Sequence, residues 1–542
     1  MTLFDRILKA RGINRNSIAD FILPDYSLLH NPFLLSDMDK AVERLIFAHK
    51  NQDKIMIYGD YDIDGLTASA LLLDAFSSFG FKNVDVFIPN RFVEGYGLTI
   101  DAIENIYESG VNLIVTVDCG SHSNKEIIRA NDLGVDVIVT DHHNIGKIIP
   151  KSIAVINPKR LDNRYPFVDL AGVGVAFKLV QAMQTRLEGL PIGQEKWLLD
   201  LVALGTVCDV VELIDENRTF VYWGLKVLAK TTRLGLKALM AVSAVEPESV
   251  NARSLGFRLG PRMNASGRLE TAQHAFDMLT TNEPMIALEK VEYLDSLNKI
   301  RRYDQDKILK QAIIQSEKYT DNPVLVVGGK DWNHGIVGIV AAKLLEKYKK
   351  PAFVFQIMGE NSKGSARSYG DFSAINAIYH CNDIITKGGG HDIAAGFIIP
   401  TSSIDIFRKK INLYYKNLKL KNQQLKLLPK ADTIVDLSEL TEEIVGLIDQ
   451  LEPFGIGNLQ PVLKSENLLV INVRKMGDNS QHIKLDLEDE NGIKMQFVAF
   501  NALDYFFVEF GEKVSVWYHV NVNEWHGNRS VEGQLLHLEI IK

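Results

Sequence analysis

Three aspartates at alternate positions, Asp60, Asp62 and Asp64, follow a short apolar run at residues 55–58 and precede a longer one at residues 66–76. A strand, an acidic turn and a helix in this order are typical of an α/β sheet, which presents ligands at the carboxyl ends of its strands. Carboxylates this close together raise one another's pKa unless a cation neutralises them. The pattern therefore predicts a divalent-metal site.

The same Asp-x-Asp-x-Asp-Gly spacing also opens a calcium-binding EF-hand loop, which needs a glutamate at its twelfth position and a helix in front. Counted from Asp60, the twelfth residue is Leu71, and the segment before the turn has the composition of a strand. These two departures argue against an EF-hand. A solvated acidic turn without chemistry is the remaining alternative.

Length and composition indicate a multidomain globular protein. The chain has 542 residues, for which about three domains are expected. With 46% apolar and 24% charged residues, it can build buried cores. No apolar run is long enough to span a membrane, and the first residues lack a signal-peptide pattern. Three scattered cysteines give no disulfide framework, so we expect a cytoplasmic location.

The net charge of −8 argues against general attraction to a polyanion, so a nucleic-acid surface would have to be a local basic groove. One candidate is the segment 408–430, which holds eight lysines or arginines and no acid. It is either a solvated face or the wall of a nucleic-acid path. Trp517, Tyr518 and Trp525 are either stacking platforms for bases or part of a domain core.

Five strand candidates separated by helical patterns predict a mostly parallel, doubly wound sheet. They are residues 55–58, 84–88, 113–117, 135–140 and 153–156.

Polar side chains recur where these apolar segments end. Asp118 follows the third candidate and Asp141-His142-His143 follows the fourth. A further apolar segment, residues 201–208, which we interpret as another strand, ends at Asp209. Four such placements favour a common site over a solvated turn. The adjacent Cys119 and Cys208 are interpreted as small core residues, since neighbours in a strand point to opposite faces.

The second half of the chain predicts three further parts. Residues 284–318 carry helical spacing with a charged face and predict a long helix joining two domains. A second α/β unit follows, with strands at 324–327 and 352–355 around a helix at 336–348. Short β-like segments after residue 430 (462–463, 468–473, 482–487, 495–500, 513–522 and 535–541) predict a small barrel.

The Asp141-His142-His143 sequence, together with the upstream aspartate turn and Val117-Asp118-Cys119-Gly120, resembles the DHH phosphoesterase superfamily. Further segments narrow the resemblance to the RecJ family of single-strand exonucleases. In family order, they are residues 88–97, 260–268, 364–368, 388–391, 453–458 and 523–530.

This resemblance implies the domain order and the activity. It implies N-terminal helices and a DHH domain at residues 1–283, a connecting helix at 284–318 and a DHH-associated (DHHA1) domain at 319–407. A basic linker at 408–430 and an OB-fold barrel at 431–542 complete the chain. The implied activity is metal-dependent hydrolysis of single-stranded DNA to mononucleotides in the 5′→3′ direction, in repair and recombination.

The oxygen-rich candidate set favours Mg²⁺ or Mn²⁺ over zinc, and two such ions suit phosphodiester hydrolysis. The resemblance implies one ion on Asp64, Asp118, His142 and Asp209, and a second on Asp62 and Asp118. Asp60 is either a further ligand or a neighbour of the ligands.

The resemblance also implies that His143 faces the scissile phosphate and that Asp141 orients a neighbouring group. Tyr58 stands where some relatives have a histidine ligand, so we expect a weaker second metal site.

Guanidinium and hydroxyl groups in glycine-flanked segments suit phosphate binding. The candidates are Arg91, Arg262, Asn264, Arg268, Ser365 and Arg367. The resemblance implies that Ser365, Arg367, Arg91 and Arg262 form a pocket for the 5′ end and that His391 lies near the substrate.

The implied partners are single-stranded DNA with a 5′ end, a helicase and a single-strand DNA-binding protein, with no membrane; we expect a monomer. One alternative is a short-oligonucleotide phosphodiesterase of the same superfamily, which typically lacks the C-terminal barrel. Another is a non-catalytic single-strand-binding scaffold, which typically loses the metal-binding carboxylates that this chain keeps. A haloacid-dehalogenase phosphatase would not account for Asp141-His142-His143.

Overall fold

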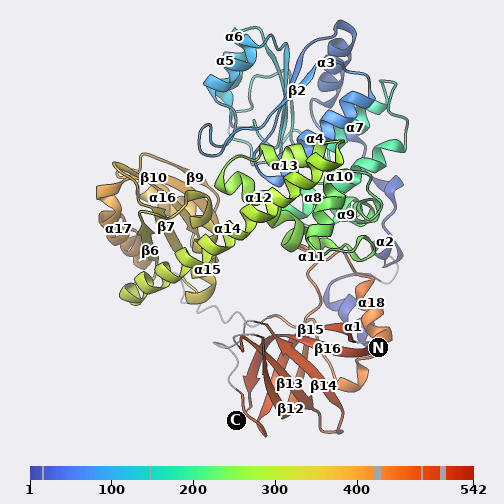
Figure 1. The fold of residues 1–542 in the computed structure, drawn as a ribbon, viewed down its shortest axis with the longest axis vertical. Helices are drawn as coiled ribbons and strands as arrows, with labels where there is room; N and C mark the ends of the chain where they lie inside the picture. The colour runs from blue at the N-terminus through green and yellow to red at the C-terminus, as the bar shows by residue number, and fades with distance from the viewer. Residues whose placement is uncertain are drawn as a thin grey trace. The chain divides into compact units, whose positions relative to one another are not determined.

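The structure is a computed structural model that describes residues 1–542 except 15–17, 147, 419–428, 478–479, 501–507, 526, 542 and the side chain of Trp525. It divides into two compact units. The larger unit comprises residues 30–209 and 223–426, and the smaller unit comprises residues 1–29, 210–222 and 427–542. The expected fold class, with a doubly wound sheet, a connecting helix, a second α/β domain and a C-terminal barrel, is confirmed (Figure 1).

The first sheet of the larger unit is wholly parallel, with the strand order β2-β1-β3-β4-β5. Its strands lie close to the expected positions: β1 (Ile55–Tyr58), β2 (Val84–Phe87), β3 (Leu113–Val117), β4 (Asp136–Thr140) and β5 (Ala154–Ile156). β1 and β3 are buried along their whole length, as apolar runs covered on both faces require. Helices α4 (Ile63–Ser78) and α7 (Gly172–Gln184) contact one face, and α5 (Ile100–Glu108) and α6 (Asn124–Asp132) pack on the other.

Residues 199–209 form the helix α8, so the expected strand at residues 201–208 is wrong. Every residue from Leu199 to Thr206 is buried, and α8 packs against α4. A helix buried on all sides has no polar stripe, so its sequence resembles that of a buried strand.

The larger unit contains fourteen further described α-helices or parts of them. They are α3 (Met38–Asn51), α4 (Ile63–Ser78), α5 (Ile100–Glu108), α6 (Asn124–Asp132), α7 (Gly172–Gln184), α9 (Asp215–Leu228, in part), α10 (Leu234–Val242), α11 (Ala252–Ser254), α12 (Gly260–Leu269), α13 (Gln273–Thr280), α14 (Pro284–Ser316), α15 (His334–Tyr348), α16 (Ala374–His380) and α17 (Ile404–Asn417). The helix α14 is the expected long connection and reaches from α10, α12 and α13 to α15 and β6 (Figure 1).

The second sheet has the order β6-β7-β8-β10-β9, in which only β6 and β7 are parallel. Its strands are β6 (Leu325–Gly329), β7 (Ala352–Gln356), β8 (Asn361–Arg367), β9 (Lys387–Gly390) and β10 (Ala394–Pro400). The helix α15 packs on β7 and β8, α14 contacts β6, and a core around Phe353, Phe355 and Phe397 fills the other side of the sheet.

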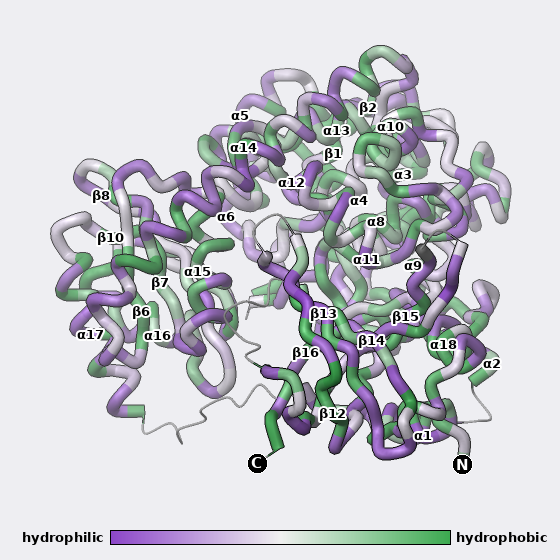
Figure 2. The backbone as a smooth tube through the Cα atoms, turned by 60° about the horizontal axis from the view of Figure 1, so that its bottom comes forward, coloured by the Kyte–Doolittle hydropathy of each residue, from purple (hydrophilic) through white to green (hydrophobic). Residues whose placement is uncertain are grey.

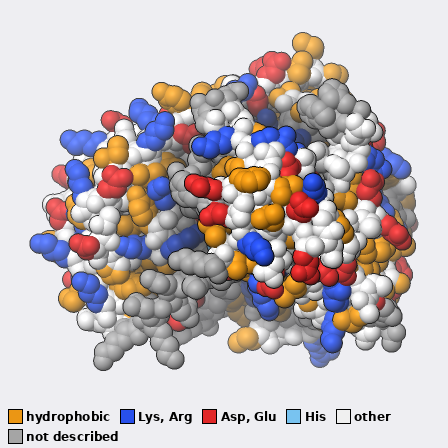
Figure 3. All heavy atoms as spheres, turned by 90° about the horizontal axis from the view of Figure 1, so that it is seen from below, with side chains coloured by type: hydrophobic (Ala, Val, Ile, Leu, Met, Phe, Trp, Pro, Cys, Tyr) orange, Lys and Arg blue, Asp and Glu red, His pale blue; other side chains and the backbone are white. Residues whose placement is uncertain are grey.

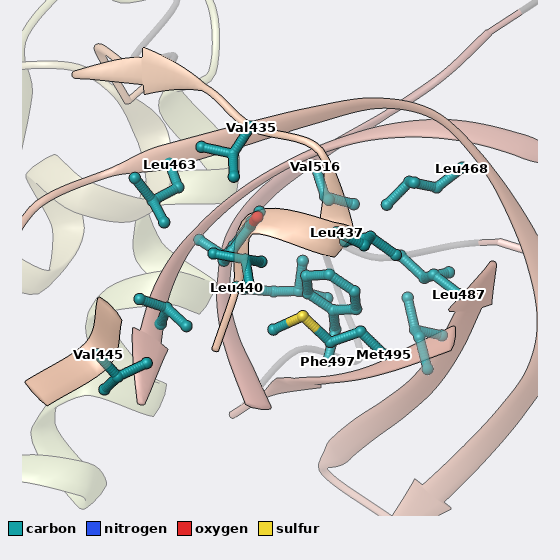
Figure 4. Close-up of a cluster of buried hydrophobic side chains, with 14 of the residues drawn as sticks. Val435, Leu437, Leu440, Val445, Leu463, Leu468, Leu487, Met495, Phe497 and Val516 are labelled. Atoms are coloured by element: carbon teal, nitrogen blue, oxygen red, sulfur yellow. The ribbon is translucent and has the colours of Figure 1, made fainter. Parts of the chain in front are cut away.

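The smaller unit is a closed barrel in which β12 pairs with β13 on one side and with β15 on the other. Its strands are β11 (Thr433–Ile434), β12 (Leu463–Met476), β13 (His482–Glu488), β14 (Lys494–Ala499), β15 (Lys513–Trp525) and β16 (Asn528–Ile540), with the helix α18 (Glu442–Asp449) beside them. Alternate residues of β13 are buried, and the tube in Figure 2 alternates between purple and green along these strands. Buried side chains such as Leu463, Leu487 and Phe497 meet inside the barrel (Figure 4).

Two segments that we expected within residues 1–283 belong to the smaller unit instead. Helix α1 (Leu3–Ala10) places Leu3 and Ile7 in the barrel core, and Arg6 pairs with Glu439 at 2.8 Å. The helix α2 (Ile18–Ile22) and residues 210–222 join through Arg218, which donates to the Phe21 carbonyl at 2.9 Å. These contacts depend on tertiary packing, which the local sequence does not specify.

The aromatic and basic candidates of the C-terminal half are mostly structural where they are described. Tyr518 is buried in the barrel core and its hydroxyl lies 2.9 Å from that of Ser465. Trp517 is 6% exposed and packs against His537 and Lys464 instead of joining that core. Arg408 pairs with Asp405, and Lys410 pairs with Asp383. Lys419, Lys421, Lys426 and the side chain of Trp525 lie outside the described residues.

The surface shows no general positive charge on the face seen in Figure 3, where acidic and basic side chains are interspersed. This agrees with the argument that a nucleic-acid surface must be local. Among the described residues, no helix combines the length and the apolar composition needed to cross a membrane.

Candidate active site

The strand order places the aspartate turn at the topological switch point of the first sheet. β1 lies between β2 and β3. The chain passes from β1 to β2 on one side and then crosses to β3 on the other side, so the direction of winding reverses at β1. Ligand sites in open parallel sheets form at such a point, outside the carboxyl ends of the strands. Asp60, Asp62 and Asp64 follow β1, Asp118 follows β3, and Asp141 begins the segment after β4. The sheet therefore brings these turns to one edge.

Two helix termini hold the aspartates of the first turn. Asp62 caps α4, because its Oδ1 accepts the backbone N–H groups of Asp64 and Gly65 at 3.0 and 3.2 Å. Both carboxylate oxygens of Asp64 accept backbone N–H groups at the start of α7, from Gly172 at 2.6 Å and Val173 at 2.8 Å. Positively polarised helix N-termini thus face both acids.

Gly172 is required by this close approach. A Cβ at this position would lie 2.8 Å from the Cβ of Asp118 and 2.9 Å from Oδ2 of Asp64. Asp118 itself has a φ of 59°, in the left-handed region that non-glycine residues rarely adopt, while its N–H still bonds to the Thr140 carbonyl at 3.0 Å. Backbone strain of this kind is often found at functional sites.

Three overlapping groups of side chains each offer ligand atoms that lie within 4.8 Å of one another. The groups are Asp64-His142-Asp209, Asp118-His142-His143 and Asp60-Asp62-Asp118. Nε2 of His142 lies 3.1 Å from Asp118 Oδ1 and 3.5 Å from Asp209 Oδ2. Asp209 stands at the end of α8 and belongs to the first of these groups, although its segment is a helix and not the expected strand.

The electrostatics of these groups favour a bound cation. Burial, and then the Asp64 charge, raise the pKa of Asp118 well above its usual value. Burial, and then the Asp209 charge, do the same to the pKa of Asp64, and burial with Asp62 raises the pKa of Asp209 to about 7. The ionised forms of these carboxylates therefore destabilise one another unless a positive charge lies between them.

Unpartnered atoms support the same conclusion. Oδ1 of Asp60, Oδ1 of Asp118 and Nε2 of His142 are buried without a hydrogen-bond partner among the described residues. Buried polar atoms normally have partners, and leaving each one unpaired costs about 1–3 kcal/mol. Oxygen and imidazole ligands left open in this way fit a hard divalent ion such as Mg²⁺ or Mn²⁺.

His143 is held by a separate network. Its Nδ1 lies 2.8 Å from Asp141 Oδ1 and 3.0 Å from the hydroxyl of Tyr96. Asp141 also accepts the backbone N–H groups of Ser121 and His142, at 2.9 and 2.7 Å. Burial lowers the pKa of His143, but the hydrogen bond to Asp141 and the charges of Asp141, Asp209 and Asp62 together outweigh burial, so the net shift is upward. Asp141 therefore holds the ring of His143 in place and favours its protonated form.

Tyr58 does not take part in the acidic cluster. Its ring is buried in the core and stacks on Phe87, and its hydroxyl donates to the Gly97 carbonyl at 3.1 Å. Cys119 is buried, and burial raises the pKa of its thiol. Burial likewise raises the pKa of the Cys208 thiol. Neither thiol is suited to nucleophilic attack, because the reactive form is the thiolate.

Beside the acidic cluster lies a cavity of about 700 Å³ that is lined by basic and glycine residues, and we call it the basic pocket. Its described lining contains no aspartate or glutamate. The charged and polar lining residues are Tyr61, Arg91, Tyr96, His122, His143, Arg268, His334, Lys363, Ser365, Arg367, Lys387 and His391. The first α/β domain and the second sheet both contribute to it.

The arginines of the pocket lack acidic partners there. Arg91 stacks on the ring of Tyr61 at 4.1 Å, and its Nε is buried without a hydrogen-bond partner among the described residues. Burial, followed by the charge of Arg91, lowers the pKa of Arg268 to about 10. Burial also lowers the pKa of Arg367. Like charges collected in this way favour an anion such as phosphate.

Arg262 and Asn264, two of the residues predicted to bind phosphate, are not part of the described lining of the basic pocket. Arg262 forms an ion pair with Asp295 at 2.8 Å and donates to the Arg258 carbonyl. Asn264 is half-buried on the same helix, α12. The glycines around them serve helix packing: a Cβ at Gly260 would lie 2.7 Å from the sulfur of Cys208.

Sequence reasoning missed several side chains that the structure brings to the site. Tyr96 lies within residues 88–97, one of the segments that resemble the RecJ family, but only the fold shows its contact with His143. His334, Lys363 and Lys387 also line the basic pocket. Lys363 and Lys387 directly precede two of the segments that resemble the RecJ family, residues 364–368 and 388–391, whereas His334 adjoins none of them. Apart from its glycines, nothing in the sequence of the N-terminus of α7 indicates that its backbone N–H groups bind Asp64.

Comparisons with known proteins match all three parts of the chain. Residues 54–206 match the DHH family, N-terminal domain, residues 321–417 match the DHHA1 domain, and residues 431–537 match the RecJ OB domain. The chain is 34% identical to the single-stranded-DNA-specific exonuclease RecJ of Haemophilus influenzae, over 98% of this chain and 95% of that protein. It is 37% identical to the Bacillus subtilis protein of the same name, of which it spans only 65%.

Solved structures agree with the sequence matches. The crystal structure of RecJ in complex with Mn²⁺ from Thermus thermophilus has a TM-score of 0.84 and 27% sequence identity, covering 99% of this chain and 76% of that one. The identity over nearly the whole length of a curated relative shows that the chain belongs to the RecJ family.

Proposed function

We propose that this chain is a metal-dependent exonuclease that hydrolyses single-stranded DNA to mononucleotides in the 5′→3′ direction, in DNA repair and recombination. The observation that carries the proposal is the pair of neighbouring sites with opposite charge: three overlapping ligand groups beside a cavity lined by arginines and lysines. The RecJ relatives are named as single-stranded-DNA-specific exonucleases, and their solved structures contain Mn²⁺ or Mg²⁺.

In this proposal the acidic cluster holds two divalent ions. Asp64, Asp118, His142 and Asp209 would hold one, and Asp62, Asp118 and Asp60 the other, consistent with the three ligand groups. When bound, Mn²⁺ or Mg²⁺ supplies the charge that stabilises the attacking and leaving oxygens in phosphodiester hydrolysis. Asp118, which belongs to two of the groups, would bridge the two ions.

The remaining side chains orient the substrate and move a proton. His143, held by Asp141, would donate a hydrogen bond to the scissile phosphate or a proton to the leaving oxygen. Arg91, Arg268 and Arg367, with Ser365, would bind the 5′ phosphate, and the neighbouring His391 would contact the strand.

The proposed division of the chain follows the earlier boundaries except for the two segments of the smaller unit, residues 1–29 and 210–222. The DHH domain, the connecting helix at 284–318 and the DHHA1 domain at 319–407 carry the reaction, and the barrel at 431–542 binds the strand. Residues 1–29 are assigned to the barrel because α1 shares its core. The proposal extends to a helicase and a single-strand DNA-binding protein as partners, which only the resemblance implies.

The test is a Mn²⁺-dependent digestion of two single-stranded oligonucleotides, one labelled at its 5′ end and one at its 3′ end. We expect immediate release of a labelled mononucleotide from the first and a shrinking ladder from the second. Asp118→Ala should abolish both, whereas Asp85→Ala should not, because Asp85 is exposed on β2 and pairs with Lys54. Binding without cleavage would indicate the scaffold, and cleavage of only the shortest oligonucleotides would indicate the oligonucleotide phosphodiesterase.

A further inference from the structure

The three arginines that line the basic pocket are held in different ways. Arg268 and Arg367 each donate to a backbone carbonyl, at 3.1 and 2.8 Å. The guanidinium of Arg91 instead lies over the ring of Tyr61, with its central carbon 4.1 Å from the ring centre. An aromatic ring therefore takes the place that a backbone carbonyl has beside the other two cations.

The backbone of Arg91 is fixed by the loop that follows β2. The carbonyl of Asn90 accepts the three backbone N–H groups of residues 93–95, at 3.0–3.1 Å. The side chain of Asn90 accepts the N–H of Phe92 at 2.8 Å and donates to the Glu270 carbonyl at 3.3 Å. The side chain of Arg91 lacks such support, because its Nε is buried without a hydrogen-bond partner among the described residues. The place of its guanidinium thus depends on the aromatic ring.

That ring belongs to the turn that carries the candidate metal ligands. Tyr61 lies between Asp60 and Asp62, and close packing fixes the backbone of the turn on two sides. A Cβ at Gly65, in the first turn of α4, would lie 2.5 Å from the backbone nitrogen of Asp60. A Cβ at Gly267, on α12, would lie 2.9 Å from the Tyr61 carbonyl. The ring therefore starts from a backbone that is fixed relative to both aspartates.

Stacking suits a guanidinium that binds an anion. The face of a phenol ring attracts a cation. A stacked guanidinium keeps the N–H groups at its edge free for a bidentate contact with phosphate oxygens. A carboxylate partner would compete with the phosphate for these donors, and the described lining of the basic pocket contains no carboxylate. The ring thus orients Arg91 without neutralising it.

We propose that Tyr61 is a positioning residue for the 5′ phosphate, because its ring holds the guanidinium of Arg91 at a fixed place relative to the aspartate turn. The inference rests on the proposed function, in which Arg91 binds the 5′ phosphate, and deepens it. Since Tyr61 is part of the turn that would hold the ions, the end of the strand and the ions keep one spacing. A fixed spacing is what the release of one nucleotide at a time requires.

The test measures kcat and KM in Mn²⁺ on single-stranded oligothymidylates with a 5′-phosphate or a 5′-hydroxyl, each labelled at the 3′ end. The readout is the end preference, which is the ratio of kcat/KM for the two strands. Tyr61→Leu should lower it by about 3- to 30-fold, the size of a partly desolvated cation–π contact, mainly through a higher KM for the phosphorylated strand. Tyr107→Leu is the matched control, because it makes the same change at an exposed position of α5 outside the pocket lining.

A double-mutant cycle with Arg91→Ala tests whether the two side chains act together. In the Arg91→Ala background, Tyr61→Leu should change the end preference less than about twofold, because the cation that the ring orients is gone. Losses that add in the double variant would overturn the inference, since Tyr61 would then act without Arg91. An equal loss of kcat on both strands would overturn it as well, because Tyr61 would then serve only the shape of the aspartate turn.

A second set of variants keeps the shape of the side chain and stays informative if Tyr61→Leu fails to fold. Tyr61→Phe should keep the end preference, because it keeps the ring. Phenylalanines with increasing numbers of ring fluorines at position 61 should lower the preference stepwise, because fluorine weakens the negative face of the ring. A preference that is independent of fluorination, or that Tyr61→Phe already abolishes, contradicts the inference.

Failure of the proposed function is distinguishable from failure of this inference. If the wild type cleaves neither strand, the proposed function fails by itself. Fluorescence anisotropy with the two strands in EDTA then measures the end preference as a ratio of Kd, without hydrolysis. The same cycle applies: a loss that is not additive supports the coupling of Tyr61 to Arg91, and additive losses or a wild type without end preference overturn it.

Discussion

The acidic cluster and the basic pocket are neighbours in one unit, and each collects side chains whose charges repel one another. In the cluster, burial and mutual repulsion raise the pKa of Asp64 and Asp118. In the pocket, burial and neighbouring cations lower the pKa of Arg268. The attraction between them is the smaller effect: the charge of Arg91 lowers the pKa of Asp60 and that of Asp62 raises the pKa of Arg268, but burial and like charges decide the net shifts. Each is arranged for a charge that comes from outside the protein.

The two regions differ in how they are built. The cluster comes from strand and helix termini at one sheet edge, held by short backbone contacts such as Gly172 N–H to Asp64 at 2.6 Å. The pocket is assembled from loops, a helix terminus and a second sheet, and its cations lie on separate segments. We therefore expect substitutions in the cluster to act on the reaction as a whole and substitutions in the pocket to act on the choice of 5′ end.

The largest effect is expected for Asp118→Asn. Because Asp118 belongs to two of the three ligand groups, the change should lower kcat/KM on single-stranded DNA by about 10³-fold, or about 4 kcal/mol. It should also raise the melting temperature of the metal-free protein, since it removes one of the repelling charges. Rates and melting curves of both proteins, with Asp85→Asn as the control, check this. Activity within tenfold of wild type would contradict the bridging role.

The next effect distinguishes two arginines. Arg367→Ala should lower kcat/KM for a 5′-phosphorylated strand by about 10- to 100-fold, the loss of a charged hydrogen bond of about 1.5–3 kcal/mol. A 5′-hydroxyl strand should be little affected. Arg262→Ala should leave this preference unchanged and lower the melting temperature, because Asp295 loses its partner at 2.8 Å. A selective loss with Arg262→Ala instead would place that residue in the phosphate site.

The same contrast explains what the sequence could predict. β1 and β3 were located to the residue, because fully buried parallel strands are short apolar runs bounded by turns. The residues of the acidic cluster follow from these strands by proximity in sequence. The helix α8 was mistaken for a strand, yet Asp209 still reaches the cluster, since both elements deliver their last residue to the same edge.

The pocket was less predictable because the role of an arginine depends on its partners. Arg262 and Arg268 lie on one helix, six residues apart, and only the tertiary contact with Asp295 on α14 separates them. Lys363 and Lys387 become neighbours only through the register of β8, β10 and β9. Such long-range pairing has no signal in a single sequence.

A third prediction concerns pH in the metal-free protein. The folded-state pKa of Asp209 is about 7, raised by burial and by Asp62. Between the unfolded value of about 4 and this value, the folded state binds the proton more tightly, so stability falls as the pH rises through that window. We expect the difference in melting temperature, Asp209→Asn minus wild type, to grow by a few degrees between about pH 5 and about pH 8.

Saturating Mn²⁺ should reverse this trend for the wild type, because a bound cation favours the ionised carboxylates. Scanning calorimetry with and without the metal measures both. A difference that is independent of pH would mean that Asp209 is not coupled to the cluster. No pH dependence is expected from the basic pocket in this range, since the lowered pKa of Arg268 is still about 10.

The smallest effect is expected where the two regions meet. Tyr96 lines the pocket, and its hydroxyl lies 3.0 Å from Nδ1 of His143. Tyr96→Phe should lower kcat by about 2- to 10-fold, the loss of one hydrogen bond of about 0.5–1.5 kcal/mol, with metal affinity unchanged. Tyr58→Phe is the matched control: among the described residues its hydroxyl bonds to the buried Gly97 carbonyl alone, so stability should fall while kcat holds. Equal effects of both variants on kcat would show that the two tyrosines act through packing and that the contact of Tyr96 with His143 does not contribute to the reaction.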